Sequence, residues 1–132
     1  MSISWYSLDR DLQTVDHETI SLVQANQIID RYFATLEPHY ESGEDALAAT
    51  MFGFQRSDRS YIQICIHAAD EIDVEYDFSL IRYPLLRLVA GRRQRDERLI
   101  SAQDVKARTK LFFEHTREEF QQLLRDKRAG LG

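Results

Sequence analysis

Cysteine, proline and long apolar runs are all scarce in this sequence. Cys65 is the only cysteine, so an internal disulfide cannot form and the single thiol cannot build a zinc site. No apolar run approaches the roughly 20 residues that span a bilayer. The amino-terminal stretch MSISWYSLDRDL lacks the basic start and the apolar segment of a secretory signal. We therefore expect a cytoplasmic protein with no membrane partner.

Motifs of cofactor and metal sites are missing as well. The sequence holds no glycine-rich phosphate loop and no Gly-x-Ser-x-Gly nucleophile turn. His17, His39 and His115 lie far apart, without the spacing of zinc ligands on one helix. The sequence therefore predicts no cofactor, no metal site and no catalytic residue.

The composition is that of one compact globular domain, residues 1–132. Hydrophobic residues make up 43% of the chain and charged residues 30%, with only two prolines. A chain of this length buries about two thirds of the surface that it exposes when unfolded, so a single core is expected.

The most regular pattern runs from residue 61 to residue 78, where apolar and polar residues alternate. It predicts two antiparallel strands, YIQICIH and IDVEYDF, joined by a tight turn at AADE. If the apolar side chains share one face, Ile66 pairs with Ile72 and the turn centres on Ala69, although a slip by two residues would keep the same faces. The predicted register also pairs Ile64 with Val74, Ile62 with Tyr76, Cys65 with Asp73, Gln63 with Glu75, Tyr61 with Asp77 and His67 with Glu71.

Two further strands are predicted, at residues 3–8 and from about residue 49 to residue 56. The second extends the hairpin into a central meander over 49–78. A first helix is predicted over 21–36, with Ser21 and Gln24 as its capping box and Pro38 just beyond its end. Alternatively, the stretch ETISLV forms a strand and this helix begins one turn later.

Two more helices are predicted in the second half of the chain. One begins near Pro84 and stops at Gly91, and an exposed loop over 91–98 follows it. The other runs from Ser101 to about residue 126, either as one rod or as two helices, because Thr116 and Glu119 form a further capping box. The predicted fold is α+β, an antiparallel sheet of three to five strands with helices packed on one face.

Charge is distributed unevenly along the chain. Residues 1–81 hold 15 acidic and four basic side chains, whereas residues 82–132 hold 13 basic and seven acidic ones, giving a net charge of −5. The two halves can neutralise each other within one fold, or the acidic half can attract a basic partner. Six of the basic residues are the arginine cluster at positions 82, 87, 92, 93, 95 and 98. Because few aromatic residues stand among them and the whole chain is acidic, we do not expect nucleic-acid binding.

The polar face of the predicted hairpin is the candidate functional site. One hypothesis is that this face is only solvated and has no function. A second is that it is a partner-binding surface, which would suit a basic protein. A third hypothesis is a small metal-dependent or thiol hydrolase that uses this face, with Cys65 beside His67. Alternate strand residues lie about 7 Å apart, so one metal ion would rarely reach all the acids of the second strand. The partner-binding hypothesis assigns contacts to Tyr61, Gln63, His67, Glu71, Asp73, Glu75 and Asp77.

Two stretches, YIQICIHAADEIDVEYDFS and ISAQDVKARTKLFFEHTREEFQQLL, give the chain a resemblance to small bacterial immunity proteins against contact-delivered polymorphic toxins. The resemblance covers roughly residues 50–125 and lies in size, acidity, the short antiparallel sheet and the terminal helix. It implies a cytoplasmic protein that binds a cognate toxin domain and blocks it. Together with the acidic face of the hairpin, this predicts a non-enzymatic inhibitor, monomeric or homodimeric, of a basic toxin domain. It transfers no family residue to a position of this chain.

Overall fold

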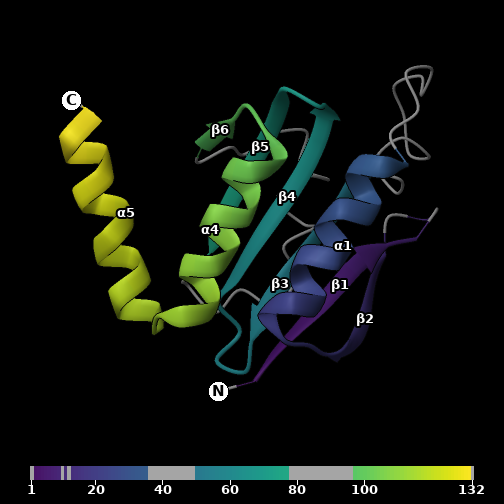
Figure 1. Cartoon of the computed structure of the whole chain (residues 1–132). Coiled ribbons are helices and arrows are strands. Elements are labelled where there is room, and N and C mark those ends of the chain that lie inside the picture. The colour runs from purple at the N-terminus through teal and green to yellow at the C-terminus, as the bar shows by residue number, and fades with distance from the viewer. Residues whose placement is uncertain (1, 10, 12, 36–49, 78–96, 132) are drawn as a thin grey trace.

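The computed structural model describes residues 2–9, 11, 13–35, 50–77 and 97–131, with the backbone alone described at positions 77 and 127–131 (Figure 1). The predicted helix at 84–91 lies outside these residues. The arginine cluster lies outside them too, except for Arg98.

Six strands form one antiparallel sheet in the order β2-β1-β3-β4-β5-β6. The α+β class is confirmed, but the prediction of three to five strands is too low. The strands not predicted are β2 and β6, whose sequences, TVDHET and ERL, are polar and short. The strand bounds are β1 Ile3–Leu8, β2 Thr14–Thr19, β3 Met51–Arg56, β4 Tyr61–Ala68, β5 Glu71–Asp77 and β6 Glu97–Leu99.

The helices in the described part of the chain are α1 (Leu22–Ala34), α4 (Ala102–Glu114) and α5 (Arg117–Leu131). The capping box of α1 is confirmed: Ser21 Oγ accepts from the Gln24 amide at 3.2 Å and Gln24 Oε1 accepts from the Ser21 amide at 2.9 Å. Helix α1 ends at Ala34 rather than residue 36, with Thr35 as its C-cap. Thr116 and Glu119 make the same reciprocal bonds, so the carboxy-terminal stretch forms two helices.

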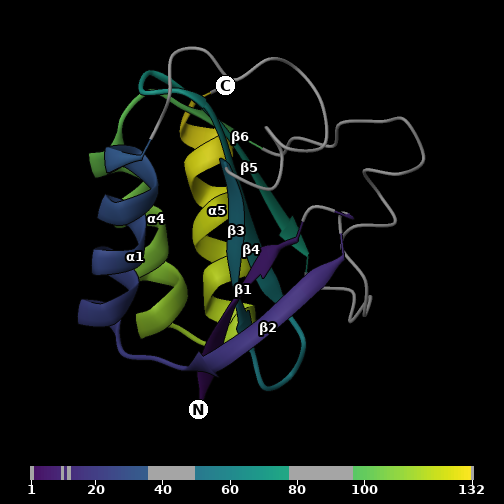
Figure 2. The same ribbon diagram turned by 90° about the vertical axis from the view of Figure 1, so that its right-hand side faces the viewer.

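Helices α1 and α4 lie side by side on one face of the sheet, and α5 follows beyond α4 toward the β5–β6 end (Figures 1 and 2). The core fills the space between the helices and the sheet. From the sheet come Phe52, Phe54, Ile62, Ile64, Ile66, Ile72, Val74 and Tyr76, and from the helices Ala25, Ile28, Ile29, Val105, Phe112, Phe120 and Leu124. None of the described helices combines the length and apolar character that a bilayer span requires.

The predicted register of the central hairpin is confirmed from Tyr61–Asp77 through Ile66–Ile72. It is wrong at the turn, where Glu71 pairs with Ala68 instead of His67. The strands connect through the two residues Ala69 and Asp70 rather than through an odd-length turn centred on Ala69. A two-residue connection suits the twist of antiparallel strands, and a bulge at His67 absorbs the extra residue.

Candidate functional site

The polar face of the central hairpin is buried rather than solvated. Tyr61, Gln63, Asp73 and Glu75 lie on it, and Asp73, the most accessible of these, is only 7% exposed. A row of exposed carboxylates was the sequence-based expectation for this face, and for Asp73 and Glu75 it is wrong. Because buried polar groups must find hydrogen-bond partners, the face is organised as two internal networks.

The first network crosses the sheet from β1 to β5. The Tyr6 hydroxyl donates to Gln63 Oε1 at 3.2 Å, and Gln63 Nε2 donates to Glu75 Oε2 at 3.2 Å. The Tyr61 hydroxyl donates to the other oxygen of Glu75 at 3.4 Å, and its ring meets Tyr6 edge to face. Tyr6 passes over Gly53, which lies opposite it on β3 and where a Cβ would overlap the phenol ring. Because Gly53 has no side chain, Tyr6 of β1 can extend across β3 and contact Gln63 of β4.

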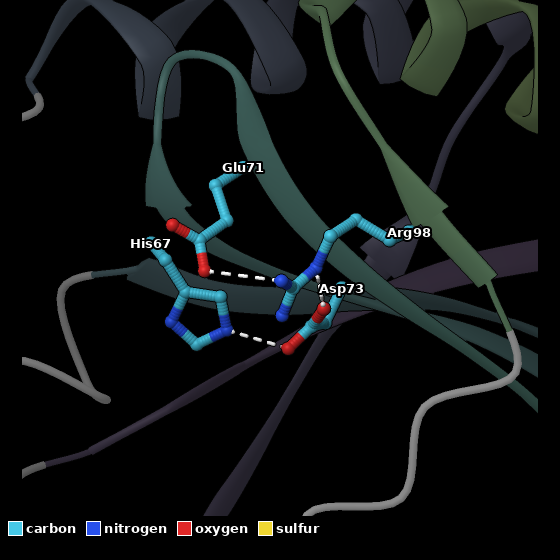
Figure 3. A network of polar contacts seen from close by, with 4 residues as sticks. All are labelled: His67, Glu71, Asp73 and Arg98. Atoms are coloured by element: carbon cyan, nitrogen blue, oxygen red, sulfur yellow. Dashed lines mark hydrogen bonds and ion pairs between the residues drawn. The ribbon is translucent and has the colours of Figure 1, made fainter.

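The second network lies at the β4–β5 turn and reaches β6 (Figure 3). Asp73 is its centre, because Oδ2 lies 2.7 Å from His67 Nε2 and Oδ1 accepts from Arg98 Nε at 2.9 Å. Arg98 also forms an ion pair with Glu71 at 3.3 Å. Burial opposes ionisation of Asp73, but the hydrogen bonds from Arg98 and His67 outweigh it and hold the pKa of the carboxyl below its ordinary value. Asp73 is therefore a buried anion matched by a cation.

Arg98 was predicted to lie in an exposed loop; it is exposed, but the prediction of a loop is wrong. It belongs to β6, where it pairs with Asp73 across the backbone as well as through its side chain. The two flanking residues of β6 point to the helix side of the sheet. Leu99 enters the core. The Glu97 carboxylate accepts hydrogen bonds from Arg108 of α4 at 2.8 and 2.6 Å and from the Tyr76 hydroxyl at 2.7 Å. Burial and the neighbouring Glu97 raise the pKa of Tyr76.

The candidate residues are thus brought together in two groups rather than in one row. Tyr61, Gln63 and Glu75 belong to the first network; His67, Glu71 and Asp73 belong to the second. Only the backbone of Asp77 is described, and it pairs with Tyr61 as predicted. Among the candidates whose side chains are described, Glu71, 47% exposed, and His67, 16% exposed, are the two that a partner could reach. Their role in binding stays a prediction.

Cys65, the thiol named in the hydrolase hypothesis, is poorly placed for a substrate. Cys65 is buried and lies across from Asp73, whose two oxygens are both engaged. Within residues 2–9, 11, 13–35, 50–77 and 97–131, no group of three or more His, Cys, Asp or Glu side chains could hold a metal ion.

Further exposed carboxylates lie at the β2 end of the sheet and in the β4–β5 turn. Asp11, Asp16 and Glu18 lie on the β1–β2 hairpin and are exposed, as is Asp70 in the β4–β5 turn. The ion pairs found among described residues involve none of them. The acids of the β1–β2 hairpin were not among the predicted site residues, although the stretch DRDLQTVDHE contains four acids and one arginine.

Comparison with known proteins adds no relative. Protein-family models, curated proteins and solved structures all yield no significant match to this chain. What the described residues establish is an α+β protein with a six-stranded antiparallel sheet covered by helices on one face.

Proposed function

We propose that this is a non-enzymatic binding protein of the immunity type, which neutralises a cognate, basic toxin domain through an acidic surface. The observation that carries the proposal is the set of exposed carboxylates on the β1–β2 hairpin, Asp11, Asp16 and Glu18, which take part in no ion pair with other described residues. We define this set as the hairpin acids.

Several acids of the carboxy-terminal half, unlike the hairpin acids, have a cationic partner. There, Glu97 is paired with Arg108, and Glu118 with Arg117. Exposed like charges that are left together repel each other and raise the electrostatic energy of the free protein. A basic partner relieves that repulsion, and long-range attraction accelerates its approach within the screening distance of about 8 Å at physiological salt.

Burial of the polar face also favours binding over catalysis. Glu75 and Asp73 are hydrogen-bonded inside the sheet, where they hold strands together. The contact surface is therefore assigned to the hairpin acids rather than to the central hairpin, of which Glu71 and His67 are secondary candidates. In this proposal the protein acts in the cytoplasm on a protein partner, without a cofactor, nucleic acid or membrane.

The experiment begins with capture of the partner from the source cell by the tagged protein, followed by production of the captured domain in a separate host. We expect that domain to arrest growth and co-production of this protein to restore it. The variant Asp16→Ser/Glu18→Ser should restore growth less well. Glu114→Ser/Asp126→Ser, which removes the same charge from exposed positions of α4 and α5, should match the wild type. A captured domain that does not arrest growth, or equal rescue by the two double variants, would contradict the proposal.

A further inference from the structure

The outer edge of β2 has the features of a docking site for an extended chain. In the described part of the protein, β2 pairs with β1 alone and forms one end of the sheet, as the edge-on view shows (Figure 2). A terminal strand leaves half of its backbone N–H and C=O groups without a partner strand. Such an edge can be extended by a strand from another protein.

The hydrogen-bond pattern identifies which groups point outward. The Asp9 amide donates to the Gln13 carbonyl at 3.0 Å, so these two residues form a hydrogen-bonded pair. Bonded and non-bonded pairs alternate along antiparallel strands, which makes Ser7–Val15 the next bonded pair. Thr14 and Asp16 therefore direct their N–H and C=O groups away from β1. The register shifts opposite Trp5, where β2 has one residue more than β1, and the regular outward ladder ends there.

The side chains of β2 select the kind of chain that can pair with it. Edge strands are commonly protected by proline, by charged side chains or by a bulge. β2 has no proline or lysine, its charges are acidic, and its bulge lies beyond Asp16. Its charged residues are Asp16 and Glu18, both exposed, and Val15 beside them is 38% exposed. A second copy of this chain pairing edge to edge would bring the acids of the two strands together, which is unfavourable. A basic strand would instead place lysine or arginine beside them.

We propose that the edge of β2 accepts an extended, basic segment of a protein partner as an additional strand, paired to the outward groups of Thr14 and Asp16. This inference rests on the proposed function, since it specifies how the basic partner is held. Backbone hydrogen bonds supply the pairing, and Asp16 with Glu18 supply the preference for positive charge.

The test uses a probe peptide with blocked ends, about ten residues of alternating lysine and threonine, a length typical of long strands. The control peptide has the same sequence with every peptide nitrogen methylated, so it keeps the charge and cannot donate a backbone hydrogen bond. Amide hydrogen exchange of the full chain is followed by NMR at low salt. We expect the unmethylated peptide to slow exchange at the Thr14 and Asp16 amides about tenfold or more, and the methylated peptide to leave them unchanged.

Variants of the protein give a second, independent measurement. Thr14→Pro removes one outward amide without changing charge and should weaken binding of the unmethylated peptide about tenfold, whereas Thr14→Ala should change it by less than about twofold. Equal binding of both peptides, with no protection of Thr14 and Asp16, would overturn strand pairing and leave the growth-rescue result untouched. Absence of binding by either peptide would overturn it too. Protection that grows with protein concentration alone would assign the edge to a second copy.

Discussion

At the scale of single residues, the structure depends on polar side chains that are buried and fully engaged. Asp73 is held between His67 and Arg98, and Gln63 bridges Tyr6 and Glu75. Removing one member of such a network takes one hydrogen bond from a buried polar neighbour, which costs about 1–3 kcal/mol. Because these bonds join side chains of different strands, they help to hold the strands in their observed alignment.

Gly53 gives the sharpest test of that alignment. In Gly53→Ala the added methyl group would overlap the Tyr6 ring and lie 2.7 Å from the Ile62 carbonyl oxygen, which is backbone and cannot turn aside. We expect the free energy of unfolding to fall by about 3 kcal/mol in urea denaturation. Adding Tyr6→Leu should recover only part of the loss, because the clash with the Ile62 carbonyl remains. A Gly53→Ala variant as stable as the wild type would contradict the close packing of β1 over β3.

Asp73 predicts how stability changes in acid. Its pKa in the folded protein is below the ordinary value of about 3.9, so the unfolded chain binds the proton more readily. The stabilisation from its ionised form is thus present above that ordinary value and is lost as the pH falls through the lower, folded one. We expect Asp73→Asn to be clearly less stable than the wild type near pH 7 and the difference to shrink toward about pH 3. Urea denaturation across this range measures it.

The matched control is Asp16→Asn, an exposed carboxylate in no ion pair with described residues, which should follow the wild-type profile. A constant difference between Asp73→Asn and the wild type at all pH values would mean that the charge of Asp73 contributes nothing.

At the scale of elements, one arginine joins the sheet to the junction of α4 and α5. Arg56 is buried at the end of β3 and donates to two carbonyls, that of Phe112 in the last turn of α4 and that of His115, the C-cap of this helix. Its guanidinium also lies 3.9 Å from the centre of the Phe112 ring. It therefore satisfies helix-end carbonyls that would otherwise be buried without donors, and the chain can turn into α5 at Thr116.

We expect Arg56→Met to lower the free energy of unfolding by about 3 kcal/mol, since methionine fills the space but leaves these carbonyls without donors. The neighbouring Arg59→Met is the control: Arg59 is exposed in the β3–β4 turn, and its replacement should change stability by less than about 0.5 kcal/mol. Guanidinium denaturation of both variants makes the comparison. Equal effects would show that Arg56 is not a cap.

An element can be predicted from the sequence when the contacts that form it are between residues close together in the chain. The hairpin register and the caps at Ser21 and Thr116 depend on alternation and on contacts within a few residues, and these predictions are confirmed. Strand β2 depends on pairing with β1 rather than on its own apolar residues, so its polar sequence gave no signal. The bulge at His67 depends on the turn geometry, which alternation does not encode.

The site was harder to predict than the fold for the same reason. Burial of Gln63 depends on Tyr6, 57 positions earlier, and Asp73 is neutralised by Arg98, 25 positions later. Alternation shows which residues share a face, but it does not show whether that face is covered. The prediction that the polar residues of the central hairpin share one face is therefore confirmed, whereas the prediction that this face is solvated is wrong for Gln63, Asp73 and Glu75.

At the scale of the whole molecule, the uneven charge of the sequence is only partly neutralised among described residues. Arg98 and Arg108 of the basic half do engage acids, but Arg108 pairs with Glu97 from the same half. The hairpin acids remain exposed at the β2 end of the sheet, at the far side from β6. The proposed basic partner would neutralise these exposed acids. Because the attraction is electrostatic, its association should depend on the salt concentration.

The most direct test of this account is the association rate of the captured partner domain, measured by stopped flow between about 0.02 M and about 0.3 M salt. We predict a rate for the wild type that falls steeply with salt, and a slower, flatter dependence for Asp16→Ser/Glu18→Ser. Glu114→Ser/Asp126→Ser should behave like the wild type. A rate that is independent of salt, or one lowered equally in both double variants, would contradict recognition through the hairpin acids.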